Sequence, residues 1–148
     1  MRTIVQQTEL AVELNTELNI NYFNQSKYWL KKKHNIKNMA HTYEASEEDI
    51  GVITKFINRH IGPETGRAID LCGGMGRCAK VLERYAEKID VLDLKPGNAW
   101  IKDSKKGRLI TSDLRNIGQH CEPSTYDLVF GNWALCYIND ENVDGVLE

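Results

Sequence analysis

The sequence lacks any long hydrophobic run and any strong excess of one charge. No stretch approaches the roughly 18 consecutive apolar residues of a membrane span, and the N-terminus, MRTIVQQTEL, lacks the apolar core of a secretory signal. With 19 basic and 21 acidic side chains the net charge is −2, so neither a nucleic acid nor an acidic membrane is expected as a partner. We therefore expect an intracellular protein, in the cytoplasm or the nucleus.

The cysteines of the sequence are not arranged as in a metal site. The 4 cysteines include no C-x-x-C pair, and no histidines are paired at ligand spacing, so we expect reduced thiols and no metal. Internal repeats and low-complexity segments are absent as well. A composition of 41% hydrophobic and 27% charged residues in 148 residues is typical of a globular chain with a real core.

The first part of the chain has helical spacing. Leucines recur every fourth position (Leu10, Leu14, Leu18), and an aromatic cluster follows them (Tyr22, Phe23, Tyr28, Trp29, Leu30). A second stripe consists of isoleucines (Ile50, Ile53, Ile57, Ile61). Ser46 and Asp49 precede this stripe and resemble a capping box that opens a helix. These patterns predict an N-terminal helical cap over residues 1–61.

From residue 62 onward, short apolar runs alternate with helical or polar segments. Each run is about one strand long: AIDLC (68–72), IDVLDL (89–94), RLIT (108–111) and YDLVF (126–130). Between the first two, CAKVLERYAEK (78–88) places Val81, Leu82 and Tyr85 on one helical face. Strand, helix and strand at this spacing indicate a βαβ unit, so residues 62–148 are predicted to form an α/β domain with a parallel sheet.

A glycine-rich turn follows the first predicted strand, in the stretch RAIDLCGGMGR (67–77). The strand ends near Asp70, and Gly73, Gly74 and Gly76 allow backbone N–H groups to approach a ligand that side chains would block. Asp93 ends the second strand about 20 residues downstream, where an acidic residue in nucleotide-binding folds holds two ribose hydroxyls. The alternative is a plain β–α turn with a surface aspartate.

The turn fits one of two ligand classes better. A dinucleotide site has the pattern G-x-G-x-x-G, whereas a methyl-donor site has an acidic residue and then G-x-G; the run D-L-C-G-G-M-G-R is closer to the second. Asp113 and Leu114 follow the third strand, where an adenine would lie. Asn132 and Trp133 follow the fourth, beside the reactive centre of the donor.

These motifs together resemble a known family. The order YW (28–29), AIDLCGGMGR, DVLDL, TSDL and YDLVFGNWALCYIND is similar to that of the protein α-N-terminal methyltransferases. Members of this family use S-adenosylmethionine to methylate the α-amino group of proteins that begin X-Pro-Lys or X-Pro-Arg. The resemblance covers roughly residues 22–148. It implies a Rossmann-like class I methyltransferase sheet, its first four parallel strands in the order 3-2-1-4, behind the helical cap.

The resemblance also implies roles for individual residues. Asp70 would stabilise the glycine turn and the methionine end of the donor, Gly74 and Gly76 would let the backbone approach, and Arg77 would pair with the donor carboxylate. Asp93 would hold the ribose. The remaining residues would flank the adenine (Asp113, Leu114), line the methyl group and the peptide channel (Asn132, Trp133), and close over the site (Trp29). Trp29 and Trp133 could equally be core residues.

The chain departs from the family pattern at several places. Cys72 stands where the donor loop has its first glycine, and Tyr137 stands where the family has a histidine proposed as the base. A tyrosine is a poor proton acceptor near neutral pH because its ordinary pKa is about 10. The segment KNMAHTYEAS (37–46) replaces a glycine-rich gate after the YW pair.

The last departure concerns the end of the sheet. Asp140 opens a final helix, DENVDGVLE, after which the family has three more strands. We expect either a fragment of a longer enzyme or a partner chain that covers the open sheet edge. Two functions remain open: a methyltransferase acting on protein N-termini, and a degenerate, inactive relative that serves as a structural or regulatory subunit. Methylation of a small molecule or of another nitrogen is a third reading.

Overall fold

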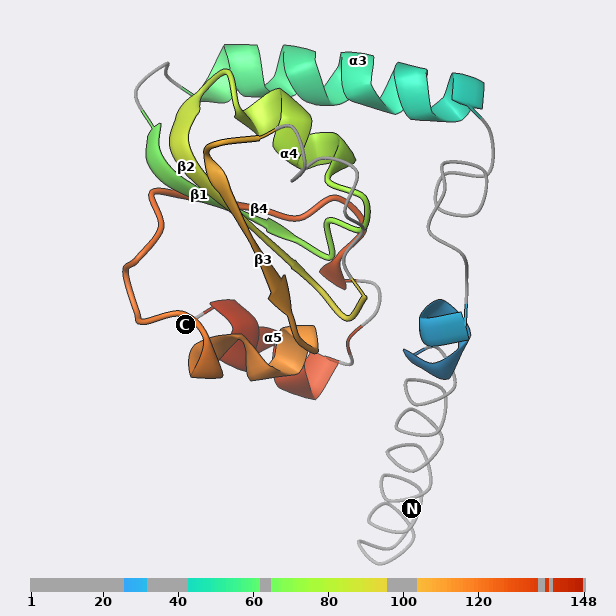
Figure 1. Ribbon diagram of the computed structural model, residues 1–148, viewed down its shortest axis with the longest axis vertical. Helices are drawn as coiled ribbons and strands as arrows, with labels where there is room; N and C mark the ends of the chain where they lie inside the picture. Colours follow the sequence, from blue (N-terminus) through green and yellow to red (C-terminus); the bar gives the residue numbers. More distant parts are fainter. Residues whose placement is uncertain are drawn as a thin grey trace, which may run out of the picture.

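The fold is a four-stranded parallel sheet between two helical layers (Figure 1). The structure is a computed structural model, which describes residues 26–31, 43–61, 65–95, 104–135, 138 and 140–147. The elements in chain order are α3 (Tyr43–His60), β1 (Thr65–Leu71), α4 (Arg77–Leu82), β2 (Ala86–Asp93), β3 (Gly107–Thr111), a 3-10 helix η1 (Leu114–Gln119), β4 (Leu128–Phe130) and α5 (Asp140–Leu147). The strand order is β3-β2-β1-β4, which confirms the predicted order.

The strands lie where the apolar runs predicted them, with corrections at their ends. β1 begins at Thr65 and ends at Leu71, so that Cys72 already belongs to the turn. β4 is shorter than predicted, because Tyr126 lies outside the strand and donates a hydrogen bond from its hydroxyl to Asp90 at 2.6 Å. Both ladders of β1 are parallel, and its last four residues are buried.

The helix after the glycine turn is shorter than the predicted 78–88. α4 ends at Leu82, and the N–H of Tyr85 donates to the Leu82 carbonyl at 2.9 Å in the turn that follows. Ala86 is already paired with Thr65 in the ladder between β1 and β2. Tyr85 therefore does not lie on the helical face; its hydroxyl donates to the Asn58 side chain of α3.

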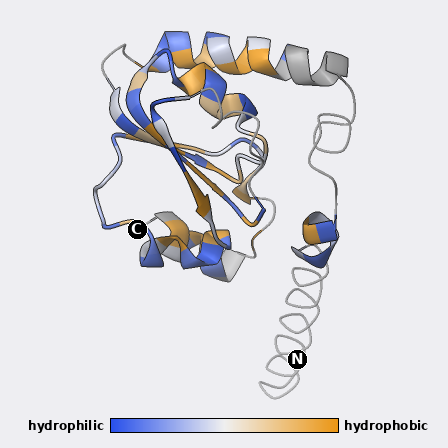
Figure 2. Ribbon diagram, viewed as in Figure 1, coloured by the Kyte–Doolittle hydropathy of each residue, from blue (hydrophilic) through white to orange (hydrophobic). Residues whose placement is uncertain are grey.

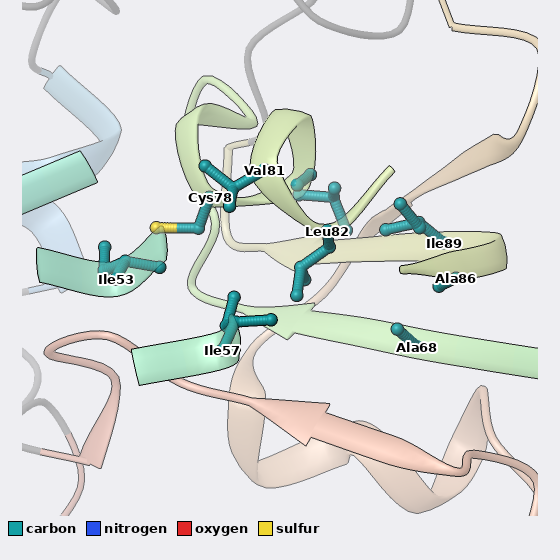
Figure 3. Close-up of a cluster of buried hydrophobic side chains, with 10 residues drawn as sticks. Ile53, Ile57, Ala68, Cys78, Val81, Leu82, Ala86 and Ile89 are labelled. Carbon is teal, nitrogen blue, oxygen red and sulfur yellow. The ribbon is translucent and has the colours of Figure 1, made fainter. Parts of the chain in front are cut away.

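One face of the sheet is covered by α3 and α4, whose apolar side chains interdigitate (Figure 3). Ile53 and Ile57 of α3 contribute to the same buried cluster as Leu82 of α4 and Ile89 of β2, which confirms the isoleucine stripe. The prediction of a capping box at Ser46 is wrong, because α3 already begins at Tyr43. The division of the chain at residue 61 stays a prediction.

The other face of the sheet is apolar only over its carboxyl-terminal half. There Ile69, Leu92 and Ile110 pack with Leu114 of η1 and Val146 of α5. Figure 2 shows the same contrast along β3, which is hydrophilic where it begins and hydrophobic toward its arrowhead near α5. Among the described helices, none combines the length and the hydropathy needed to cross a bilayer.

Candidate functional site

The carboxyl-terminal edge of β1 continues into a tight glycine turn. Gly74 and Gly76 have positive φ angles of 55° and 77°, a conformation that side chains disfavour. Gly73 is required for a different reason: a Cβ there would lie 2.6 Å from the Asp70 carboxylate and 2.7 Å from a methyl group of Val91. The turn can pass over the end of the sheet only because these positions carry no side chain.

Asp70 lies beneath this turn and is 1% exposed. Its carboxylate accepts the N–H of Ala79, in α4, at 3.1 Å. Burial raises the pKa of Asp70 to about 7, the negative charge of Asp93 adds to the rise, and the Ala79 hydrogen bond and the Arg77 guanidinium oppose it. Three ionisable groups that the sequence predicted as site residues therefore interact around one turn.

Asp93, the last residue of β2, holds the turn from the neighbouring strand. One of its carboxylate oxygens accepts the N–H of Gly74 at 3.0 Å, and the other accepts the N–H of Lys95 at 2.7 Å. A carboxylate offers about four lone-pair directions, so both oxygens keep the capacity to accept a further donor, such as a ribose hydroxyl.

Cys72 has a φ of 54°, in the left-handed region that favours glycine. The backbone thus keeps a glycine-like conformation although the residue carries a side chain. That side chain is half-buried and packs against the apolar cluster on the α5 side of the sheet. The departure from the family pattern is accommodated at the cost of local backbone strain.

The residues predicted to flank an adenine are engaged within the protein. Asp113 caps η1 by accepting the N–H of Arg115 at 3.0 Å, and the Arg115 guanidinium binds the two carboxylate oxygens at 3.0 Å each. Leu114 is 4% exposed and belongs to the core, so its side chain does not face a ligand. Only the backbone of Leu114 remains for such a contact.

The loop after β4 presents an aromatic side chain to solvent. Trp133 is 62% exposed and has a φ of 64°, so the reading of Trp133 as a core residue is wrong. Asn132 beside it is half-buried. Gly131 brings the loop close to β1, because a Cβ at this position would meet the side chains of Ala134 and Leu71 at 3.2 and 3.8 Å.

The helical segment 26–31 approaches the same edge. Lys95, two residues after Asp93, donates from Nζ to the Leu30 carbonyl at 2.9 Å. Trp29 in this segment is half-buried and meets Tyr28 edge to face, with ring centroids 5.3 Å apart. Tyr137 lies outside the described residues.

The sequence did not single out every residue that shapes this edge. Gly73 was recognised in the turn but not as a site residue, because the atoms that exclude a Cβ there belong to Asp70 and to β2. The hydrogen bond from Lys95 to Leu30 joins residues far apart in the chain, and no local pattern signals it. The pairing of Asp113 with Arg115, by contrast, was accessible as an N-cap followed by a cation.

Several solved structures resemble this chain. A Leishmania major S-adenosylmethionine-dependent methyltransferase of the DUF858 family has a TM-score of 0.70 and 23% identity over 82% of this chain and 51% of its own. Phosphoethanolamine N-methyltransferase 1 of Haemonchus contortus, in complex with phosphoethanolamine and S-adenosylhomocysteine, has a TM-score of 0.63 and 18% identity over 89% of this chain and 28% of its own. A Methanococcus maripaludis protein assigned to the S-adenosylmethionine-dependent methyltransferases has a TM-score of 0.61 and 21% identity. The match covers 79% of this chain and 57% of that protein.

These likenesses show the fold. The chain has the Rossmann-like fold of the class I methyltransferases, as the resemblance implied. It spans 51% and 57% of the length of two of these proteins and 28% of the third. No protein-family model matches the sequence, and no curated protein matches it. None of the three names mentions protein N-termini, so the predicted acceptor stays a prediction.

The packing around the turn predicts opposite effects for two glycine-to-alanine substitutions. Gly73→Ala is expected to lower the free energy of unfolding by about 1–3 kcal/mol, because the new Cβ overlaps Asp70 and Val91. Gly51→Ala, inside α3 with no atom within 4 Å of the new Cβ, should raise it by about 0.5–1 kcal/mol. Urea unfolding measures both, and equal stability of the two variants would contradict the packing argument.

Proposed function

We propose that this chain is the donor-binding part of an S-adenosylmethionine-dependent methyltransferase. The observation that carries the proposal is the convergence of Asp70, Arg77 and Asp93 on one glycine turn at the carboxyl-terminal edge of the sheet. This edge is also where the strand order reverses, because β1 pairs with β2 on one side and with β4 on the other. Ligands of open α/β sheets bind at such a switch point.

The charges at this edge fit the proposed donor. The two oxygens of Asp93 would accept the ribose hydroxyls while they hold Gly74 and Lys95. Arg77 would bind the carboxylate of the donor, for which a planar guanidinium is well shaped. Asp70 lies buried beneath the turn, where burial raises its pKa. A cationic ligand nearby would stabilise the ionised form of this carboxyl group. When bound, the donor supplies an activated methyl group.

For the acceptor we propose the α-amino group of a protein N-terminus, in line with the family resemblance. Such an amine has an ordinary pKa of about 7.7–8.0, so a sizeable fraction is neutral near pH 7 and little proton-transfer work remains. Holding the amine in line with the methyl group then matters most, and orientation supplies roughly 7–11 kcal/mol of a barrier. Trp133, which is exposed, and Trp29 are the proposed walls of the peptide channel, and Tyr137 would stand in the position of the family base.

A second function is favoured by a specific observation. Cys72 places a Cβ in a left-handed position of the donor loop, where the backbone would lie bare against the ligand. A degenerate methyltransferase that serves as a structural or regulatory subunit would tolerate this substitution. Val129 on β4 and Leu135 after it are 52% and 43% exposed, which suits a partner chain at the β4 edge of the sheet. With either function, we propose that the protein is located in the cytoplasm or the nucleus.

Donor binding is tested with S-adenosylhomocysteine titrated into the whole protein by calorimetry. Saturable binding is expected, and Asp93→Asn should weaken it about tenfold, because one charge-assisted hydrogen bond to the ribose is lost. Asp144→Asn makes the same change at an exposed position of α5 and should leave the affinity unchanged. An absence of binding would exclude the first function and leave the degenerate subunit.

The raised pKa of Asp70 predicts pH-dependent donor affinity. The ionised form dominates only above about pH 7, and this form attracts a cationic donor. The affinity for S-adenosylmethionine should therefore rise about tenfold between pH 6 and pH 8, and Asp70→Asn should abolish this dependence. Calorimetry at both pH values measures it; an affinity that falls with pH would contradict the assigned contact.

The acceptor is tested by mass spectrometry after incubation with S-adenosylmethionine. A peptide that begins X-Pro-Lys should gain mass in steps of one methyl group, whereas its N-acetylated counterpart should not, because its amine is blocked. Cys72→Gly should strengthen donor binding and accelerate this reaction, since it restores a bare backbone in the loop. Donor binding without methylation of either peptide would favour the degenerate subunit or a different acceptor.

A further inference from the structure

A concave surface lies toward the amino-terminal ends of the strands, away from the glycine turn that follows the carboxyl end of β1. It is a cleft of about 370 Å³, lined by residues from the beginning of β1, β2 and β3 and from the segment that precedes β3. Lys88 lines it near the start of β2, whereas Asp93 ends that strand at the other edge. The cleft is therefore separate from the site proposed for the donor.

The cleft concentrates positive charge on a chain that is slightly acidic. Its lining contains five basic and two acidic side chains, a net charge of +3, although the whole chain has a net charge of −2. The basic residues come from three strands and one loop (Arg67, Lys88, Lys105, Lys106, Arg108). A concave surface with this charge attracts small anions more strongly than a flat one does.

Two arginines line the cleft, and a buried carboxylate holds them in place. Asp90 is 4% exposed, and one of its oxygens accepts hydrogen bonds from Arg67 and Arg108, each at 2.8 Å. Burial alone would raise the pKa of Asp90, but these bonds and the one from Tyr126 outweigh it and hold the pKa below its ordinary value. The guanidinium of Arg67 also lies over the Tyr126 ring, with its Cζ atom 5.1 Å from the ring centroid.

This arrangement leaves donors available to a ligand. A guanidinium has five N–H groups, and the contact with Asp90 involves one nitrogen of each arginine. The two side chains are 35% and 52% exposed, and both nitrogens lie 2.8 Å from the same oxygen, so they are fixed close together. An anion with several oxygens would find two forked donors already oriented, at little cost in side-chain entropy.

The lysines of the cleft divide into two kinds. Lys106 has a structural role, because its Nζ donates to the backbone carbonyls of Glu83 and Ala86 at 2.8 and 3.1 Å. Lys88 and Lys105 are exposed at the rim and have no partner within the part of the chain that the structure describes. They can turn toward a ligand bound on the arginines.

We propose that this cleft binds a small ligand through a diphosphate or a similar oligophosphate group. Arg67 and Arg108, fixed by Asp90, bind one phosphate, and the exposed Lys88 and Lys105 neutralise the other. Glu87 at the rim and the net charge of −2 disfavour a nucleic acid.

Inorganic pyrophosphate is the probe, titrated into the isotope-labelled protein at low salt and followed by amide NMR. We expect saturable shifts at Arg67, Lys88 and Gly107, with those of Gly74 and Asp93 unchanged. The double variant Lys88→Gln, Lys105→Gln should bind about tenfold more weakly, since charge-assisted hydrogen bonds are lost. The matched control is Lys55→Gln, Lys80→Gln, which removes two exposed cations from α3 and α4 and should bind as the wild type does.

Four results would overturn the proposal. They are an absence of saturation up to about 10 mM pyrophosphate, equal weakening by the control variant, shifts centred on the glycine turn, and tighter binding of a single-stranded oligonucleotide than of pyrophosphate. The last would assign the cleft to a nucleic acid. Shifts centred on the glycine turn would mean that pyrophosphate binds at the proposed donor site, and the other three results leave donor binding untouched; calorimetry with S-adenosylhomocysteine measures donor binding separately.

Discussion

The candidate site depends on the packing of the glycine turn against a buried carboxylate. β1 runs between two helical layers and must leave the sheet directly after Leu71. It does so because Gly73 carries no side chain above Asp70, and because Asp70 accepts the N–H of Ala79 and thereby ties the strand to α4. The hydrogen bond from Gly74 to Asp93 fixes the same turn to β2. Loss of this packing would separate all three ionisable groups of the edge.

Two buried aspartates on neighbouring strands illustrate how the surroundings decide the chemistry of one side chain. Asp70 is enclosed near another carboxylate, so burial raises its pKa to about 7. Asp90 is almost equally buried, but three donors converge on it and its pKa is lowered. The ionisation of Asp70 can therefore respond to a cationic ligand. Asp90 instead holds Arg67 and Arg108 in positions from which they can bind an anion. The two aspartates lie one register position apart but on opposite faces of the sheet, so the sheet separates opposite charge preferences on its two faces.

Much of the fold was predictable from the sequence, and the errors have local physical causes. The four apolar runs located the strands because buried parallel strands must be apolar on both faces. The helix after the turn was predicted too long, since Tyr85 continues the helical spacing but serves to contact Asn58 on α3. Of the predicted site residues, the structure brings Asp70, Arg77 and Asp93 together. The side chain of Leu114, by contrast, is buried in the hydrophobic core.

The sequence by itself determined the alternation of strands and helices and the glycine turn, because hydrophobic periodicity and backbone freedom are properties of consecutive residues. Only the tertiary structure decided which charges meet. The contacts of Asp90 join β2 to Arg67 of β1, to Arg108 of β3 and to Tyr126 before β4. The clash that requires Gly73 comes in part from Val91 on β2. Such contacts depend on strand register and on which face each side chain occupies, and these are set when the sheet assembles.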